Sequence, residues 1–300
     1  MFMMHSRWIL ILFINLALLT RSSLGEVIGF DIALSTSSLT SSQLEIFEAA
    51  ATTWTSLIRG YKGDINLSKT NTTLSIQVNT GSLATDEYGY ATINSSYYKP
   101  TTSFDYLYAH SGTITVNSSK ISALEAGTLG ATLYDVALHE IAHVMGFGLL
   151  WSGTARAKSG YQEVYIPGSG QYTGTEALAA YQAEFDPTAT FVPVELGGGV
   201  GTANYHWDEV NGGGATGLVS SFNGVDKQYE VGTGWIESNL FISQTTLASF
   251  RDIGYLTVTN PEPGHGIALI LLTLSAGARR LHRKRSDRKS IGSASAANVP

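Results

Sequence analysis

The stretch LHEIAHVMGFG, residues 138–148, places two histidines and a glutamate within five positions. His139 and His143 are four positions apart, so on a helix they lie about one turn apart on the same face. Glu140 is rotated by roughly 100° from His139 and therefore lies beside this pair. The pattern predicts that both imidazoles bind one zinc ion and that Glu140 accepts a proton from an attacking water.

This spacing is rare in a chain of such composition. With 7 histidines and 14 glutamates among 300 residues, a random order gives roughly 0.01 HExxH patterns per chain. The alternative is a pair of ordinary histidines on an amphipathic helix, and the rarity of the pattern favours the zinc site. We expect the helix to span residues 132–145 and to end at Gly146, where the chain turns away.

The third zinc ligand has to come from a separate segment. Downstream of the helix the sequence has three histidines, His206, His265 and His282, and the last two fall in the C-terminal segment discussed below. We therefore expect His206, in GTANYHWDEV, to complete the site. Two acids remain alternatives. Glu176, on a predicted helix over residues 175–185, would make a gluzincin-like site, and Asp208 would make an aspartate-type site.

A family resemblance rests on these segments. HEIAHVMGFG, followed about sixty residues later by HW, resembles the leishmanolysin-type metzincins, in which a long insertion separates the helix from the third histidine. The resemblance covers most of residues 26–260. Its most specific parts are residues 139–147 and 201–209, and FRDIGY at 250–255 resembles the closing segment of bacterial members.

Carried over residue by residue, the resemblance implies that His139, His143 and His206 bind Zn²⁺ and that Glu140 is the general base. The implied activity is that of a zinc metalloendopeptidase, which hydrolyses a protein or peptide substrate with a zinc-activated water. The implied fold is α+β, with a twisted sheet, two long helices and an irregular C-terminal subdomain. An extended substrate would pair with the edge strand of the sheet, for which we expect GTITV, residues 112–116.

One departure from the family concerns the methionine that metzincins place in a tight turn beneath the zinc. The methionines of this chain are Met1, Met3, Met4 and Met145. None follows His206, and in YEVGTGW the aligned position is Gly232. The alternative function is therefore a zinc-binding but catalytically inactive protein of the cell surface or matrix.

Hydrophobic periodicity predicts the surrounding elements. Apolar residues recur at spacings of three and four over residues 40–60, which predicts an amphipathic helix. Ser42 and Glu45 form a capping-box pattern at its start, and Gly60 ends it. The stretch between the second and third predicted strands is rich in Tyr, Ser, Thr and Asn and reads as loop with short strands. Alternation predicts these strands at residues 30–34, 72–80 and 112–118.

The N-terminus has the layout of a secretory signal peptide. A basic start precedes an apolar run at residues 8–19, and small residues lie ahead of a cleavage site after Gly25. This run is shorter than the ~20 apolar residues that a spanning helix needs. We expect residues 1–25 to be removed and the protein to be exported, to the cell envelope or the exterior of a bacterium.

The C-terminus carries a second targeting pattern. Pro-Glu-Pro at 261–263 precedes an apolar segment at 267–278 and then seven basic residues. Residues 261–289 resemble the PEP-CTERM sorting signal of exported bacterial proteins, which a membrane-bound exosortase recognises and removes. The apolar segment implies a transient membrane contact. Residues 290–300 form a polar tail, which leaves residues 26–260 as the metallopeptidase domain.

The charge of this domain excludes one class of partner. Residues 26–260 hold 9 Lys and Arg against 22 Asp and Glu, a formal net charge of −13. A domain this acidic repels phosphates, so we expect no binding of nucleic acid. The chain has no cysteine, so the fold depends on core burial without disulfides.

Overall fold

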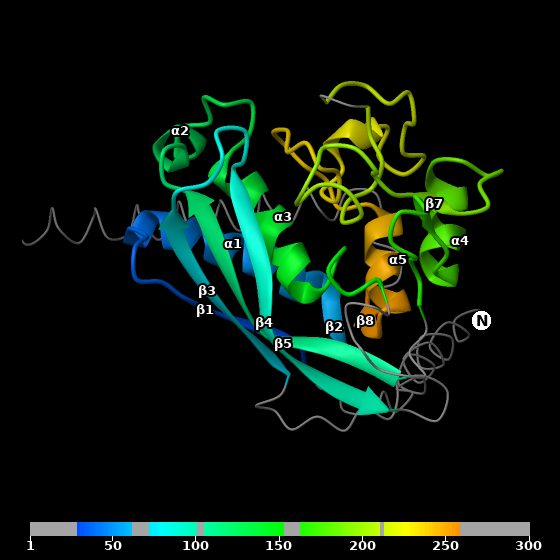
Figure 1. The fold of residues 1–300 in the computed structure, drawn as a ribbon, viewed down its shortest axis with the longest axis horizontal. Coiled ribbons are helices and arrows are strands. Elements are labelled where there is room, and N and C mark those ends of the chain that lie inside the picture. Colours follow the sequence, from blue (N-terminus) through cyan, green and yellow to red (C-terminus); the bar gives the residue numbers. More distant parts are fainter. Residues whose placement is uncertain (1–28, 62–71, 101–104, 153–162, 211–212, 259–300) are drawn as a thin grey trace, which may run out of the picture.

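A computed structural model describes most of the region between the two predicted targeting segments (Figure 1). The described residues are 29–61, 72–100, 105–152, 163–210 and 213–258. The predicted signal peptide, sorting signal and polar tail lie outside these ranges. Across the described ranges, none of the helices combines the length and the apolar character of a membrane span.

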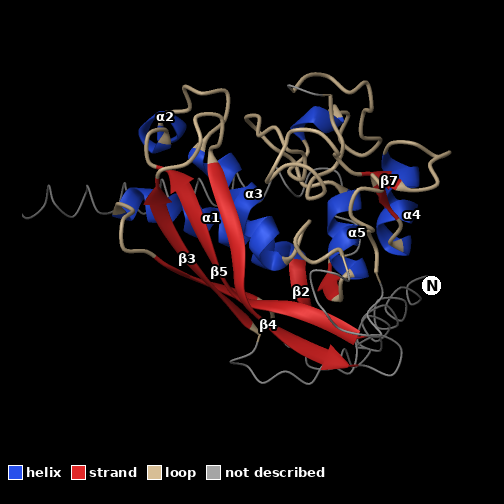
Figure 2. Cartoon of the chain, viewed as in Figure 1, coloured by secondary structure: helices blue, strands red, loops and turns tan. Residues whose placement is uncertain are grey.

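A twisted four-stranded sheet forms one side of the molecule (Figure 2). Its order is β1-β3-β5-β4. The first three strands pair in parallel, and β4 pairs antiparallel with β5 as a long hairpin. The strands are β1 (Asp31–Ser35), β3 (Thr73–Gly81), β5 (Asp105–Asn117) and β4 (Gly89–Pro100). Mixed sheet and helices together confirm the α+β class.

The predicted edge strand was wrong. GTITV lies within β5, which pairs with β3 on one side and with β4 on the other. The edges are β1 and β4, and β4 arises from part of the stretch that was expected to be loop with short strands. Its Tyr, Ser, Thr and Asn residues tolerate water on the open side of the strand, so no clear apolar alternation marks it.

Helix α1 (Ser41–Leu57) is the first long helix, and it packs against α3 (Leu133–Met145), the second. The predicted capping box of α1 was two residues late. The Thr40 hydroxyl accepts from Gln43 N at 3.3 Å, and Gln43 Oε1 accepts from Thr40 N at 3.0 Å. Gly60 does not end the helix, because the chain leaves it at Ile58 and enters strand β2 (Ile58–Tyr61).

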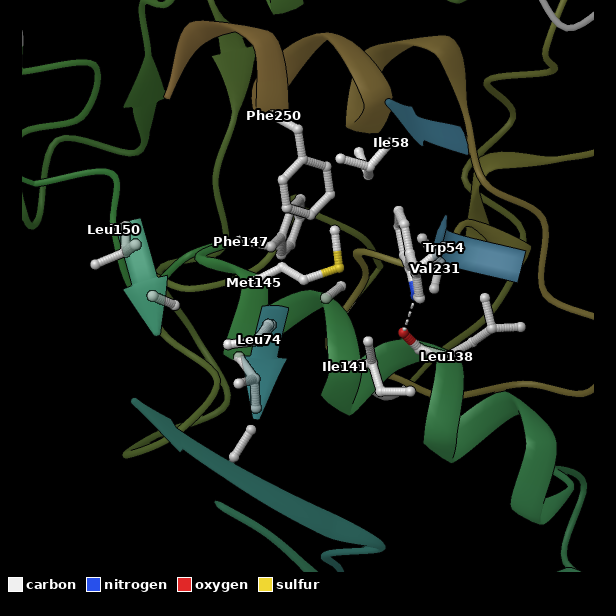
Figure 3. Packing of buried hydrophobic residues seen from close by; sticks show 14 of the residues in the cluster. Trp54, Ile58, Leu74, Leu138, Ile141, Met145, Phe147, Leu150, Val231 and Phe250 are labelled. Carbon is white, nitrogen blue, oxygen red and sulfur yellow. Dashed lines mark hydrogen bonds between the residues drawn. The ribbon is translucent and has the colours of Figure 1, made fainter. Parts of the chain in front are cut away.

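The hydrophobic core lies where α1, α3 and the sheet meet the C-terminal part of the chain (Figure 3). Trp54 of α1 is fully buried, and its indole Nε1 donates to Leu138 O at 2.9 Å. Every residue of α3 except Tyr134 is buried. A helix covered on all sides belongs to the centre of the domain, so the face carrying the HExxH motif is shielded from water as well.

The C-terminal part is irregular, as expected. Loops connect the remaining short elements, which are α2 (Ile121–Glu125), β6 (Gln171–Tyr172), α4 (Thr175–Glu184), β7 (Val192–Pro193), η2 (Lys227–Tyr229), α5 (Gln244–Asp252) and β8 (Tyr255–Thr257). Helix α4 packs against α5 (Figures 1 and 2). Strand β8 pairs with β2 and so joins the end of the described chain to the end of α1.

Candidate metal centre

Helix α3 presents the first two histidines. It begins after a capping box, in which the Thr132 hydroxyl accepts from Asp135 N at 3.2 Å and Asp135 Oδ2 accepts from Thr132 N at 3.0 Å. It ends at Gly146, whose φ of 120° turns the chain away. Between these ends the helical register places His139 and His143 on one face, and their Nε2 atoms lie 3.0 Å apart.

The third histidine follows a turn at residues 201–205 in the C-terminal part, immediately before the β-bridge residue Trp207. Glu195 N donates to His206 O at 3.0 Å, and Trp207 N donates to Gly232 O at 2.8 Å, so neighbouring segments hold the backbone on both sides. His206 Nε2 then lies 3.0 Å from His143 Nε2 and 3.1 Å from His139 Nε2. The structure therefore brings together the three histidines that the sequence predicts as metal ligands.

In each ring, the hydrogen bond made by Nδ1 determines whether Nε2 is free to bind a metal ion. A carbonyl oxygen can only accept a hydrogen bond, so each Nδ1 must carry the proton and each Nε2 presents a bare lone pair. The Nδ1 partners are Val231 O at 2.7 Å for His139, Phe147 O at 3.0 Å for His143 and Thr202 O at 2.9 Å for His206. Three converging lone pairs cannot hydrogen-bond to one another, and a shared cation satisfies all three.

Burial keeps the three rings neutral. It lowers the pKa of His143 to about 4 and that of His206 to about 3. The pKa of His139 is also well below its ordinary value, first through burial and then through repulsion by the two neighbouring rings. Neutral imidazole is the form that binds metals. The buried group His139, His143 and His206 could therefore hold a metal ion.

Glu140 lies on the same helix next to the ligand pair. Burial, followed by the charge of Glu87, raises its pKa to about 8. Among the described residues, none donates a hydrogen bond to its Oε2 atom. The carboxylate lies against the first residue of the edge strand β4, because a Cβ atom on Gly89 would come within 2.9 Å of Glu140 Cδ. Glycine at position 89 leaves the space that this carboxylate occupies.

The floor near the histidines is aromatic. A Cβ atom on Gly232 would collide with the ring of Phe147 and would lie 2.8 Å from Trp207 Cδ1. The Phe147 ring packs edge-on against Trp207, with ring centroids 5.2 Å apart, and it also contacts His143. Phe147 and Trp207 thus fill the space beside Gly232.

The two alternative acids are placed elsewhere. Glu176 pairs with Arg251, with 3.1 Å between Oε2 and Nε. Within the described ranges, the group of side chains able to share one metal ion contains the three histidines and neither Glu176 nor Asp208. Trp235 is exposed, whereas Trp207 is buried.

The site defines a class of protein, a chain with a buried three-histidine group that could hold a metal ion. Comparison with protein-family models gives no match, and no curated protein matches the chain at a significant level. The function of the chain therefore has to be inferred from the residues of the site.

Proposed function

We propose that this chain is a zinc-dependent endopeptidase in which His139, His143 and His206 hold the ion and Glu140 is the general base. The observation that carries the proposal is the convergence of three unprotonated Nε2 atoms beside that glutamate. Three neutral imidazoles form a ligand set that suits zinc and leaves a fourth coordination position open. Metzincin-type chemistry agrees with this arrangement.

The chain's own part in the reaction is the movement of protons. A zinc ion on the three imidazoles would supply a Lewis acid for the scissile carbonyl, a water pKa near 7 and positive charge that favours ionised Glu140. Glu140 takes the proton of the attacking water and passes it to the leaving amine. Its Oε2, which receives no hydrogen bond from the described residues, has lone pairs free for this task.

The edge strand supports a peptide as the substrate. Among the described strands β4 pairs only with β5, so the other side of its backbone can pair with an extended chain. The strand begins at Gly89, against which the Glu140 carboxylate lies. A peptide added along β4 would therefore pass the general base with its backbone extended, which suits cleavage within a chain.

Metal content and casein hydrolysis of the purified full-length chain test the proposal. We expect the parent to bind one zinc ion and digest casein, and His206→Ala to lose the metal. Glu140→Gln should keep the zinc and lose activity by about 10²-fold or more, because the amide cannot accept the proton. Glu176→Ala is the matched control and should keep both. If His206→Ala retains zinc and Glu176→Ala loses it, the assignment of the third ligand is wrong.

A second candidate function is a zinc-binding protein of the cell surface or matrix without catalysis. Gly232 in place of the turn methionine favours it. A parent that binds one zinc ion and never cleaves casein would support this candidate over the peptidase.

Export belongs to the proposal because residues 1–25 and 261–289 carry the two targeting patterns. Removal of the second by an exosortase-type enzyme would leave a mature C-terminus near residue 260. Mass spectrometry of the protein recovered from its producing cell measures both ends directly. An intact N-terminus on the recovered protein would contradict the signal-peptide assignment.

A further inference from the structure

Glu230 is a fully buried carboxylate that accepts four hydrogen bonds. Its Oε1 atom receives Ser243 N at 3.1 Å, Ser243 Oγ at 2.9 Å and Thr246 Oγ1 at 2.6 Å. Its Oε2 atom receives Gly232 N at 2.5 Å. The side chain is 0% exposed and faces inward, away from any substrate path in solvent. Glu230 therefore joins the start of α5 to Val231 and Gly232, the two residues that follow Glu230 in the sequence.

That segment supports two of the three histidines. Val231 O accepts from His139 Nδ1 at 2.7 Å. Gly232 O accepts from Trp207 N at 2.8 Å, one residue after His206. The side chain of Trp207 joins the same network, because its Nε1 donates to Thr246 Oγ1 at 2.8 Å and that hydroxyl donates to Glu230.

We propose that Glu230 is a positioning residue of the metal centre, which fixes the Val231 and Gly232 carbonyls and through them His139 and the segment carrying His206. It contacts neither the ion nor the substrate. The proposal rests on the three-histidine metal site, but it does not depend on the peptidase activity. Groups that orient metal-binding histidines determine ring direction and metal affinity.

The chemistry of the four contacts requires a carboxylate. Two of the donors are backbone N–H groups, Ser243 N on one oxygen and Gly232 N on the other. A backbone N–H group can only donate a hydrogen bond, so each of the two needs an acceptor oxygen. A glutamine at position 230 has one oxygen and one NH₂ group, so it must turn that NH₂ towards one of these N–H groups and leave it without an acceptor.

A second buried carboxylate provides the matched control. Glu184 is 3% exposed, and its Oε2 accepts from Thr245 N at 3.1 Å, so it also holds the start of α5. Its other oxygen accepts from Ser220 Oγ at 2.9 Å. It makes none of the contacts that support the histidines. Glu184→Ala leaves the Thr245 N–H without its acceptor and reproduces a loss of stability without touching the metal centre.

The test is a titration of the metal-free full-length chain with Co²⁺, followed by visible absorption, with Zn²⁺ affinity measured against a chelator. We expect Glu230→Gln to bind both ions about tenfold more weakly and to show a shifted Co²⁺ spectrum. Glu184→Ala should bind as the parent does, within about twofold, at a lowered Tm. Circular dichroism at the titration temperature verifies that each variant is folded.

Thr246→Val serves as the test variant if Glu230→Gln does not fold. It keeps the shape of the side chain and removes the hydroxyl between Glu230 and Trp207, and we expect about threefold weaker binding of Co²⁺. Parent-like affinity in every folded position-230 and position-246 variant would overturn the proposal, as would an equal loss in Glu184→Ala. A parent that binds Co²⁺ and never cleaves casein removes the peptidase function and leaves this inference standing.

Discussion

The Nδ1 atom of His139 lies 2.7 Å from the carbonyl oxygen of Val231, 92 residues further along the chain. This contact ties the HExxH helix to the segment beneath it and fixes which ring nitrogen faces the other histidines. The same arrangement recurs at His143 and His206 with two other carbonyls. Backbone carbonyls therefore set the direction of all three lone pairs. Substitution of a nearby side chain changes that direction only by moving the backbone.

Acid should destabilise the metal-free protein through these rings. The folded pKa of His206 is about 3 against 6.5 for a free histidine, so the unfolded state binds more protons between these values. The histidine therefore lowers the free energy of unfolding as the pH falls through this window, by about 1.4 kcal/mol per pH unit. Glu184, with a pKa raised to about 7, acts in the opposite direction.

Because of these opposed contributions, the measurement is a difference. The free energy of unfolding of the parent and of His206→Gln is measured with urea, in the presence of chelator, at a series of pH values. The difference between the two free energies should shrink between pH 6.5 and 4, because the parent loses more stability. A constant difference over that range would contradict the low pKa of His206.

Gly89→Ala should impair the proposed general base while leaving metal binding intact. The added methyl group would come within 2.9 Å of Glu140 Cδ and displace the carboxylate. We expect casein hydrolysis to fall by about tenfold to 10²-fold with zinc content unchanged, because proton transfer depends on placement. Gly29→Ala, where the new Cβ atom meets nothing within 4 Å, is the control. Full activity in Gly89→Ala would show that Glu140 can work from another position.

Gly232→Met should destabilise the fold without improving the metal centre. The new side chain has to enter space that Phe147 and Trp207 occupy, and overpacking of this kind costs about 1–3 kcal/mol. We expect a lowered Tm and no gain in casein hydrolysis. In the double variant with Phe147→Ala, part of the loss should be recovered, because the two changes share one volume. Additive losses in the double variant would show that the two residues do not compete for space.

Trp54→Phe should weaken the support of α3 from the side of α1. The substitution keeps most of the aromatic packing but removes the hydrogen bond from the indole to Leu138 O. That carbonyl is buried, so we expect a loss of about 1–3 kcal/mol in thermal or urea unfolding. Zinc content of the folded variant should equal that of the parent, and a loss of zinc would show that α1 sets the ligand geometry.

The spacing of His139 and His143 fixed two of the site residues in advance, because helical geometry repeats wherever a helix forms. His206 followed from the shortage of other histidines in the domain, and no local pattern marks its position. Glu230 could not be foreseen. A single acid in the mixed segment DKQYEVGTGW, residues 226–235, carries no periodicity, and its role depends on partners 13 and 16 residues away.

The errors in the fold have local causes. Thr40 with Gln43 and Ser42 with Glu45 both satisfy the capping-box pattern, and spacing cannot choose between them. The first pair prevails because Gln43 is buried, where its amide also donates to Glu125 at 3.1 Å. The stretch was expected to hold short strands within loop, and the single 12-residue edge strand β4 was missed because its composition resembles that of a loop.

The separation of 63 residues between His143 and His206 gives a bound ion a further role as a cross-link. The chain has no cysteine, and a staple closing a loop of this length removes about 4 kcal/mol of chain entropy from the unfolded state by the relation used for disulfides. Loss of the ion would therefore loosen the C-terminal part of the chain as well as remove the proposed catalysis. For the peptidase proposed above, scarcity of the metal would then turn metal-free copies into substrates of the remaining active copies, and the lifetime of the protein would follow the metal supply.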